Sequence, residues 1–287
     1  MKVLKSLLIL LPLMLISLTC SREKPWEKAE KLIEMGNYSE AERILLKSDT
    51  TEPMVKILLG EIYTNTGRYE KALSILRSIE KTISEDTRGR LFSALISLAQ
   101  IAREIGYRYI ASESYEIILE HEPEYDLGDG FYFLANYHFY LGQYSKALKY
   151  YTYYLETGGR LKEFLPSYLR TLYELKEYDK IIVLRDSVTQ GKSAEIDWIV
   201  GNAFYEKAKS NFERGYPDSA IIYSESFLKW GAPKVLIDDV YFIMGKSYEF
   251  LDDTANALKA YRETILNSQG RSPLLDSART RIELLTP

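Results

Sequence analysis

The chain has 287 residues, of which 46% are hydrophobic and 27% are charged, with 16 Gly and 9 Pro. This composition is typical of a globular protein and excludes a disordered, collagen-like or low-complexity chain. The net charge is −4 and the sequence has no long basic run, which argues against nucleic acid as a partner. With one Cys and two His, the chain has no pair of Cys for an internal disulfide and little material for a metal site or a His-based active site.

The first 19 residues have the pattern of an export signal. Lys2 and Lys5 precede an apolar run over residues 7–16, which is too short to cross a membrane stably. The run is followed by Cys20, which lies where a secretory peptidase would cut. We therefore predict a signal peptide over residues 1–19.

The segment before this Cys resembles the signal of bacterial lipoproteins, in which the Cys becomes the mature N-terminus and is acylated. It departs from the usual pattern, because Ser17 replaces Leu and Thr19 replaces a Gly, Ala or Ser. The alternative is an ordinary cleaved signal with an incidental thiol. The resemblance implies a lipid on Cys20, a short tether over residues 20–25 and a place in the bacterial cell envelope. Ser21 after the Cys resembles the sorting pattern of lipoproteins anchored in the outer membrane and facing the periplasm.

The rest of the chain repeats one pattern, in which a small residue is followed by a second small residue 12 positions later, with a turn between them. The five clear copies are Ala29 with Ala41, Gly60 with Ala72, Ala99 with Ala111, Ala135 with Ala147, and Gly245 with Ala257. The two weaker copies are Leu169 with Ile181, also 12 apart, and Gly201 with Ala220, which are 19 apart. The seven extra residues of that copy equal two helical turns, so they can lengthen a helix without rotating its apolar face.

The second members of these seven copies are on average 36 residues apart, and this period and pattern resemble the tetratricopeptide repeat. Small residues are needed where two antiparallel helices cross closely, and Gly in the turn can adopt a left-handed conformation. Lys176 and Asp252 replace that Gly in two of the seven turns, where we expect a distorted or differently capped turn. The resemblance implies an all-α fold, a right-handed solenoid of about seven helix pairs over residues 26–271.

The last predicted element is a helix over residues 272–287 that caps the solenoid, since a terminal repeat otherwise exposes its apolar flank. Ser272 and Pro273 supply an N-cap and a first-turn proline. The apolar stripe of this helix consists of Leu274, Leu275, Ala278, Ile282 and Leu285. The stretch from Tyr241 to Ala278 also resembles the C-terminal repeats of periplasmic envelope proteins of the BamD and CpoB families, and no functional residue is transferred from them.

Motifs of catalysis are not recognisable. The sequence Gly245-Lys246-Ser247 echoes the end of a phosphate-binding loop but lacks the earlier Gly, where Val240 stands. His138 falls where other repeats place Tyr, so we expect it in the core. We predict a protein that is not an enzyme and has no metal site and no cofactor apart from the lipid.

In such a solenoid, partners bind the concave face, which the first helix of each pair forms. Eight of the sixteen positions expected on that face in the last four repeats are aromatic, against one of twelve in the first three. The predicted groove consists of Tyr132, Asn136, Phe139, Tyr140, Arg170, Tyr173, Trp198, Asn202, Tyr205, Phe242, Lys246 and Phe250. These aromatic residues are equally suited to pack one repeat against the next, so both interpretations stay open.

The tyrosine-rich run over residues 149–154 is predicted to be a second helix. We expect Tyr151 and Tyr154 to face inward and Tyr150 and Tyr153 to face outward.

The predicted function is a protein adaptor on the periplasmic side of the envelope, with other envelope proteins or extended peptide segments as partners and no nucleic acid. The alternative is an accessory lipoprotein of a transport system that binds a small apolar molecule. An adaptor leaves the groove open and wettable, whereas a ligand site closes around a dry pocket. The sequence gives no sign of the oligomeric state.

Overall fold

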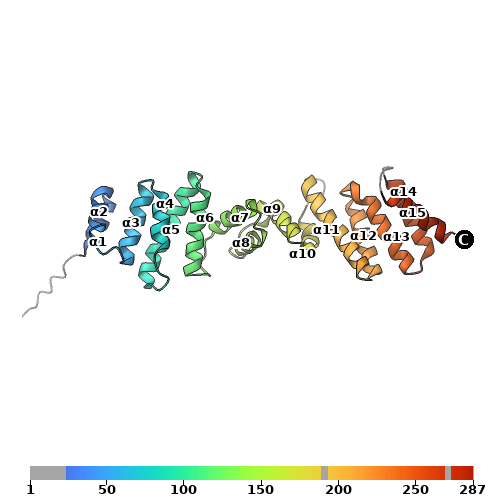
Figure 1. The fold of residues 1–287 in the computed structure, drawn as a ribbon, viewed down its shortest axis with the longest axis horizontal. Helices are drawn as coiled ribbons and strands as arrows, with labels where there is room; N and C mark the ends of the chain where they lie inside the picture. Colours follow the sequence, from blue (N-terminus) through green and yellow to red (C-terminus); the bar gives the residue numbers. More distant parts are fainter. Residues whose placement is uncertain (1–23, 189–192, 269–272, 287) are drawn as a thin grey trace, which may run out of the picture. The chain divides into compact units, whose positions relative to one another are not determined.

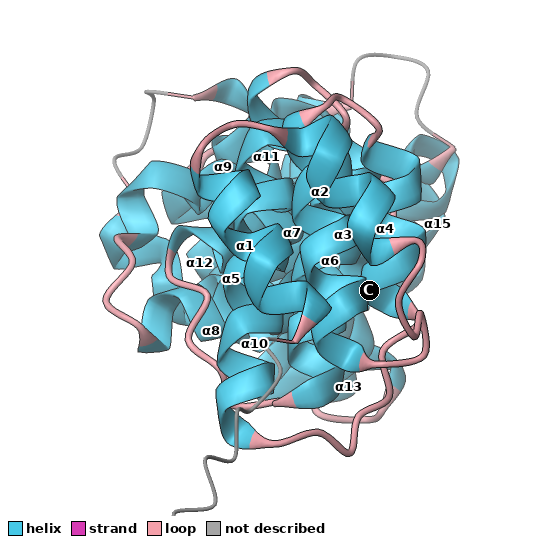
Figure 2. Cartoon of the chain, turned by 90° about the vertical axis from the view of Figure 1, so that its left-hand side faces the viewer, coloured by secondary structure: helices cyan, strands magenta, loops and turns pink. Residues whose placement is uncertain are grey.

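The computed structural model describes residues 24–188, 193–268 and 273–286. Within these ranges all regular elements are helices, fifteen α-helices and two short 3-10 helices, as Figure 2 shows. The predicted all-α fold is confirmed. The chain divides into two compact units, with the boundary in the sequence between Pro123 and Glu124, and each unit is described by itself.

Unit 1 contains three helix pairs, in which α1 packs on α2, α3 on α4 and α5 on α6 (Figure 1). Its helices are α1 (Pro25–Glu34), α2 (Tyr38–Leu45), α3 (Pro53–Asn65), α4 (Tyr69–Arg77), α5 (Glu85–Glu104) and α6 (Arg108–His121).

Unit 2 contains four further pairs, α7 with α8, α9 with α10, α11 with α12 and α13 with α14, and a last helix, α15. Its helices are α7 (Asp129–Tyr140), α8 (Tyr144–Glu156), α9 (Leu161–Glu174), α10 (Tyr178–Leu184), α11 (Ala194–Glu213), α12 (Pro217–Trp230), α13 (Ile237–Phe250), α14 (Thr254–Asn267) and α15 (Leu274–Leu285). The two 3-10 helices are η1 (Arg185–Ser187) and η2 (Lys234–Leu236).

The fourteen residues of the repeat pattern, twelve of them Gly or Ala, lie where the two helices of each pair cross, and all are buried. A Cβ added to Gly60 would lie 2.6 Å from Cδ2 of Leu76, and one added to Gly245 would lie 2.6 Å from Cε1 of Tyr261. A side chain of the second helix therefore fills the place that a larger residue would need.

The turns at Lys176 and Asp252 are not distorted, which corrects the expectation from the sequence. Their φ angles are 59° and 57°, in the same left-handed region as the 75° of Gly67. The hydrogen bond that closes the turn is also the same, since the amide of Glu177 donates to Leu172 at 2.8 Å. The closed turn holds a non-glycine residue in a conformation that costs roughly 1–2 kcal/mol.

Both predicted additions to the regular repeat are present. The helix α11 is 20 residues long, against 14 for α13, so the extra residues of the sixth repeat lengthen the first helix. The helix α15 packs on α14 through Ala278, which is fully buried with Ala257 and Tyr261. The predicted N-cap Ser272 lies outside the described residues, as do the predicted signal peptide and Cys20.

The orientation predicted for Tyr150 is wrong, because α8 packs on two neighbours. Tyr151 is fully buried, as predicted, and its ring stacks on Phe164 of α9 with centroids 4.9 Å apart. Tyr150 is only 5% exposed and stacks on His138 of α7 at 5.5 Å. The expected core position of His138 is confirmed, since its side chain is buried.

Candidate functional site

The first turns of α7 pack against the following helices. Tyr132 stacks on Tyr154 of α8 with centroids 5.3 Å apart and lies 6.0 Å from Phe164 of α9. Asn136 donates to the carbonyl of Tyr132 and accepts a hydrogen bond from the Tyr151 hydroxyl at 3.1 Å. Both predicted groove positions therefore hold α7, α8 and α9 together.

The last turn of α7 is open to solvent. Tyr140 is 74% exposed, and its ring contacts the edge of the half-buried Phe139, at 5.6 Å between centroids. Phe139 in turn lies 6.0 Å from Tyr144 of α8. Tyr140 is thus a large amphipathic side chain that the fold leaves available for contact.

Three predicted residues from two helices come together between α9 and α11. The Tyr173 ring lies 5.1 Å from the Trp198 ring, and the Arg170 guanidinium lies 5.8 Å from the same indole. Arg170 also pairs with Glu195 at 3.4 Å. Trp198 remains 37% exposed, so this cluster presents an indole and a cation side by side.

Asn202 and Tyr205 lie deeper on α11. Asn202 is 7% exposed, and its amide donates to the carbonyl of Trp198 at 2.9 Å. Burial, together with the Asp239 carboxylate, raises the pKa of Tyr205 to about 12, so the hydroxyl stays neutral. Its ring packs on Ala208 and Ala220. These two side chains support the face and do not line it.

On α13, Phe242 packs on Tyr261 of α14 with centroids 5.6 Å apart. The Lys246 ammonium lies 4.3 Å above the Phe212 ring of α11, and burial lowers its pKa. Phe250, at the end of α13, is 66% exposed.

A surface pocket of about 370 Å³ lies at these positions. It is lined by Phe212, Lys246, Glu249, Phe250 and Arg281. Phe212 and Arg281 could not be found from the repeat pattern, because they lie on the added turns of α11 and on the last helix.

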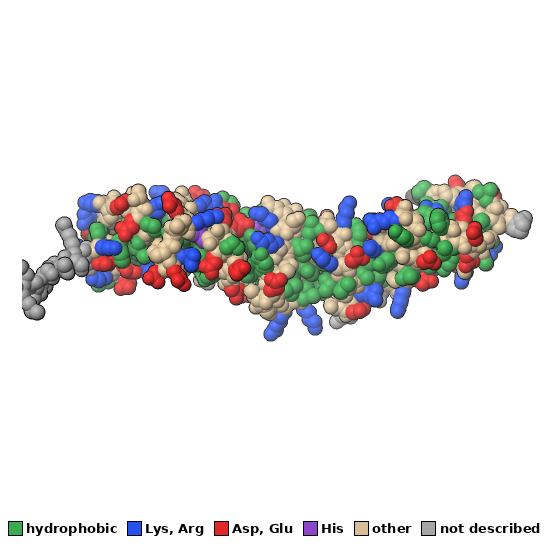
Figure 3. All heavy atoms as spheres, turned by 90° about the horizontal axis from the view of Figure 1, so that it is seen from below, with side chains coloured by type: hydrophobic (Ala, Val, Ile, Leu, Met, Phe, Trp, Pro, Cys, Tyr) green, Lys and Arg blue, Asp and Glu red, His purple; other side chains and the backbone are tan. Residues whose placement is uncertain are grey.

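The twelve predicted groove residues thus form no single site. They separate into a group on α7, a cluster between α9 and α11, and a pocket between α11, α13 and α15. Three of the aromatic residues, one in each place, stay substantially exposed and are called the exposed aromatic set: Tyr140, Trp198 and Phe250. Figure 3 shows the corresponding contrast on one face, where hydrophobic areas are larger over unit 2 than over unit 1.

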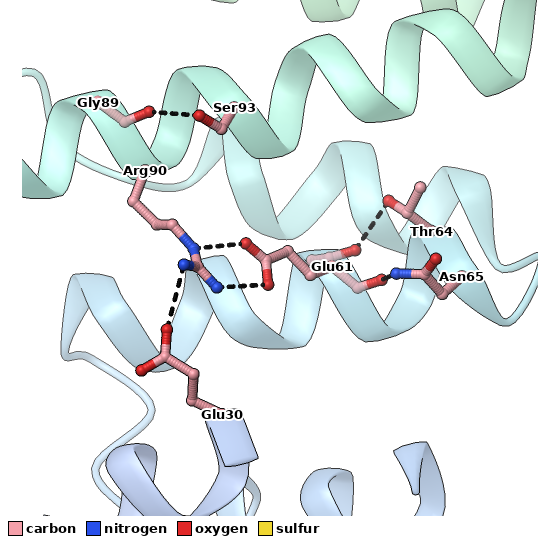
Figure 4. A network of polar contacts seen from close by, with 8 residues as sticks. Glu30, Glu61, Thr64, Asn65, Gly89, Arg90 and Ser93 are labelled. Atoms are coloured by element: carbon pink, nitrogen blue, oxygen red, sulfur yellow. Dashed lines mark hydrogen bonds and ion pairs between the residues drawn. The ribbon is translucent and has the colours of Figure 1, made fainter. Parts of the chain in front are cut away.

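The first helices of unit 1 carry paired charges instead. Arg90 of α5 contacts Glu30 of α1 at 3.1 Å and forms two hydrogen bonds with Glu61 of α3, at 2.7 and 3.1 Å (Figure 4). Two further side chains of α3, Ile57 and Thr64, are buried. One guanidinium therefore links three first helices, and its charge is satisfied within unit 1.

Two of the helix pairs match known repeats. Family profiles described as tetratricopeptide repeat match residues 55–79, which lie on α3 and α4, and residues 239–267, which lie on α13 and α14. These two helix pairs are thus similar to tetratricopeptide repeats. No curated protein matches the chain.

Several solved tetratricopeptide repeat structures are similar to the chain at low sequence identity. The C-terminal part of a repeat-containing protein from Cytophaga hutchinsonii is 16% identical, covers 88% of this chain and 98% of its own, and gives a TM-score of 0.38. A tetratricopeptide repeat protein from Parabacteroides merdae is 16% identical, with coverages of 91% and 97% and a TM-score of 0.34. YrrB, described as having an unusual peptide-binding site, is 17% identical, with coverages of 89% and 99% and a TM-score of 0.24.

The described ranges contain neither a cluster of metal ligands nor a membrane-spanning helix. No group of His, Cys, Asp and Glu there could hold a metal ion. None of the helices described is both long and apolar enough to cross a bilayer.

Proposed function

We propose that the protein is an adaptor that binds other proteins through the first-helix face of unit 2. The observation that carries this proposal is the exposed aromatic set, Tyr140, Trp198 and Phe250. Aromatic side chains are enriched at the centres of protein interfaces, where burying one supplies a large contact area at a low cost in conformational entropy. Their exposure in the free chain is unfavourable, and a partner that covers them removes that cost.

The proposal includes a place in the bacterial cell envelope. The lysines and apolar run of residues 1–19, with Cys20 at their end, support export followed by attachment of a lipid to that Cys. The resemblance of the last repeats to envelope proteins of the BamD and CpoB families agrees with this location. An adaptor held at the outer membrane and facing the periplasm would meet envelope proteins or extended peptide segments as partners.

The alternative, a site for a small apolar molecule, has less support. Such a site encloses its ligand in a largely apolar cavity. The pocket at the groove positions is lined by Lys246, Glu249 and Arg281 as well as by two aromatic rings. The exposed Tyr140 and Trp198 do not line it, so the chemistry favours a wettable protein-binding surface.

The test compares two matched variants of the full-length protein. The first replaces the exposed aromatic set, as Tyr140→Ala, Trp198→Ala and Phe250→Ala. The control replaces three apolar residues on second helices that are at least as exposed, as Val183→Ala, Ile222→Ala and Leu266→Ala. Each protein is purified from detergent-solubilised envelopes, and co-purified proteins are quantified by mass spectrometry.

We expect a defined set of proteins to fall by roughly tenfold or more with the aromatic variant, because aromatic anchors contribute about 2 kcal/mol each. The control variant should retain that set. Equal retention by both variants would exclude the first-helix face as the binding surface. If the wild-type protein retains no specific protein, the adaptor proposal fails, and native mass spectrometry for a bound small molecule tests the alternative.

A further inference from the structure

The added turns of α11 build one wall of the pocket in unit 2. The first helices α3, α7 and α13 end five residues after their small crossing residue, whereas α11 continues through residues 207–213. Phe212 lies on this extension, and its ring sits 4.3 Å from the ammonium of Lys246. The extension therefore gives the sixth repeat a contact with α13 that a helix of the usual length could not make.

Of the charged side chains that line the pocket, Glu249 and Arg281 pair with each other, whereas Lys246 has no ion pair among the described residues. Glu249 accepts hydrogen bonds from the Tyr261 hydroxyl at 2.8 Å and from Arg281 Nε at 3.0 Å, so it neutralises Arg281. Lys246 makes no ion pair within the described part of the chain. Glu213, exposed at the end of α11, acts on its ammonium electrostatically without such a contact. The pocket thus retains one unpaired positive charge.

The surroundings of Lys246 favour an anionic partner. Its ammonium lies over two aromatic faces, with Phe242 at 5.6 Å as the second, and aromatic faces stabilise a cation without neutralising it. A cation that has lost part of its hydration gains more from a carboxylate than a fully hydrated surface lysine does. The exposed ring of Phe250 lines the same pocket and offers an apolar surface beside the charge.

We propose that this pocket binds the side-chain carboxylate of an Asp or Glu in a peptide segment of the partner, while a neighbouring large apolar side chain of that segment packs on Phe250. This inference rests on the proposed adaptor function and specifies the chemistry of the partner. The carboxylate is inferred from charge complementarity with Lys246, and the neighbouring apolar side chain is inferred from the exposed ring of Phe250 in the same pocket.

The test is a selection of random peptides displayed on phage against the purified full-length protein. Lys246→Met removes the charge and keeps most of the side-chain volume. Lys259→Met is the control, since Lys259 is exposed on α14 and does not line the pocket. The wild-type and control proteins should enrich peptides in which Asp or Glu lies next to a large apolar residue, and Lys246→Met should lose the acidic preference.

An enriched peptide is then synthesised with an amidated end, together with its Asp→Asn or Glu→Gln version. We expect the acidic peptide to bind wild type roughly tenfold more tightly than the amide version and Lys246→Met to bind both alike, as a double-mutant cycle measures. The comparison of the two peptides on wild type needs no protein variant, so equal binding of the acidic and amide peptides overturns the carboxylate pocket even where Lys246→Met fails to fold.

The outcomes separate this inference from the adaptor proposal. Enriched peptides without an acidic residue, or an acidic preference that persists in Lys246→Met, overturn the carboxylate pocket and leave the adaptor standing. A selection that enriches no peptide overturns the pocket as a peptide site, and the co-purification experiment then decides separately whether the adaptor proposal also fails.

Discussion

Single glycines within the helices differ widely in what an added side chain would contact. A Cβ on Gly201 of α11 would lie 1.7 Å from the carbonyl oxygen of Ala232. That oxygen belongs to the backbone and cannot rotate away as a side chain does. Gly89, within α5, has no atom within 4 Å of the same position.

Replacing each of these glycines by Ala should therefore change stability in opposite directions. Gly201→Ala is expected to lower the free energy of unfolding by about 2–4 kcal/mol, because the clash forces the backbone apart. Gly89→Ala should raise it by about 0.5–1 kcal/mol, because Ala is the better helix former. Urea unfolding followed by circular dichroism measures the free energy of unfolding of both variants. A Gly201→Ala protein as stable as wild type would contradict the close contact with Ala232.

At the residue scale, the sequence predicts on which face of a helix a side chain lies, but not whether side chains of other helices cover it. Helical spacing places both Tyr132 and Tyr140 on the first-helix face of α7. Tyr132 is covered because Tyr154 and Phe164 arrive from two other helices, and nothing comparable covers Tyr140. Contacts between elements decide the difference, and they are not encoded in the spacing within one helix.

At the scale of the element, the turn between two helices accepts a non-glycine residue, at a cost in the free energy of folding. The left-handed conformation of Lys176 is held by the amide of Glu177, which donates to Leu172 across the end of α9. The sequence indicated that this turn lacks Gly but could not indicate that the backbone keeps the same shape. The hydrogen bonds that end the helix determine that shape, and they do not depend on the side chain.

Lys176→Gly is accordingly expected to stabilise the protein by about 0.5–1 kcal/mol, since Gly adopts positive φ without the clash of a Cβ. Lys259→Gly, at an exposed position inside α14, should destabilise it by about 1 kcal/mol. Thermal unfolding of the two variants beside wild type checks this contrast. A loss of stability in both variants would show that the turn carries no strain.

Helix length is a second feature of the elements that the sequence predicts only in part. The spacing between Gly201 and Ala220 indicates two extra turns, and α11 has them. That these turns place Phe212 over Lys246 could not be foreseen, because the spacing gives the length of the added turns and not which of their side chains faces α13. The same holds for Arg281, since the apolar stripe that predicts α15 does not include it.

For the whole molecule, one repeat pattern supports two kinds of surface. In unit 1, Arg90 forms ion pairs with Glu30 and Glu61, which lie on two other first helices. The charge of Arg90 is therefore neutralised within the unit. In unit 2, the first helices leave aromatic rings exposed and hold the half-buried cation of Lys246 without an ion pair among the described residues. A shared backbone with different first-helix side chains is sufficient for this division, and it favours unit 2 as the side that meets a partner.

Substitutions near Cys20 test whether a lipid attaches the protein to a membrane. The proposed lipid on Cys20 predicts that the protein is found in the membrane fraction of envelopes, because two or more acyl chains give stable anchoring where one does not. Cys20→Ser should leave the protein unlipidated and release it from that fraction. Ser17→Leu is the matched change, since it brings the segment closer to the usual lipoprotein pattern, and it should keep or increase lipidation. Intact mass spectrometry of detergent extracts measures the added lipid mass directly. A Cys20→Ser protein whose mass differs from wild type only by the exchange of sulfur for oxygen, and that stays in the same membrane fraction, would rule out the anchor while leaving the binding face of unit 2 to be judged by its own experiment.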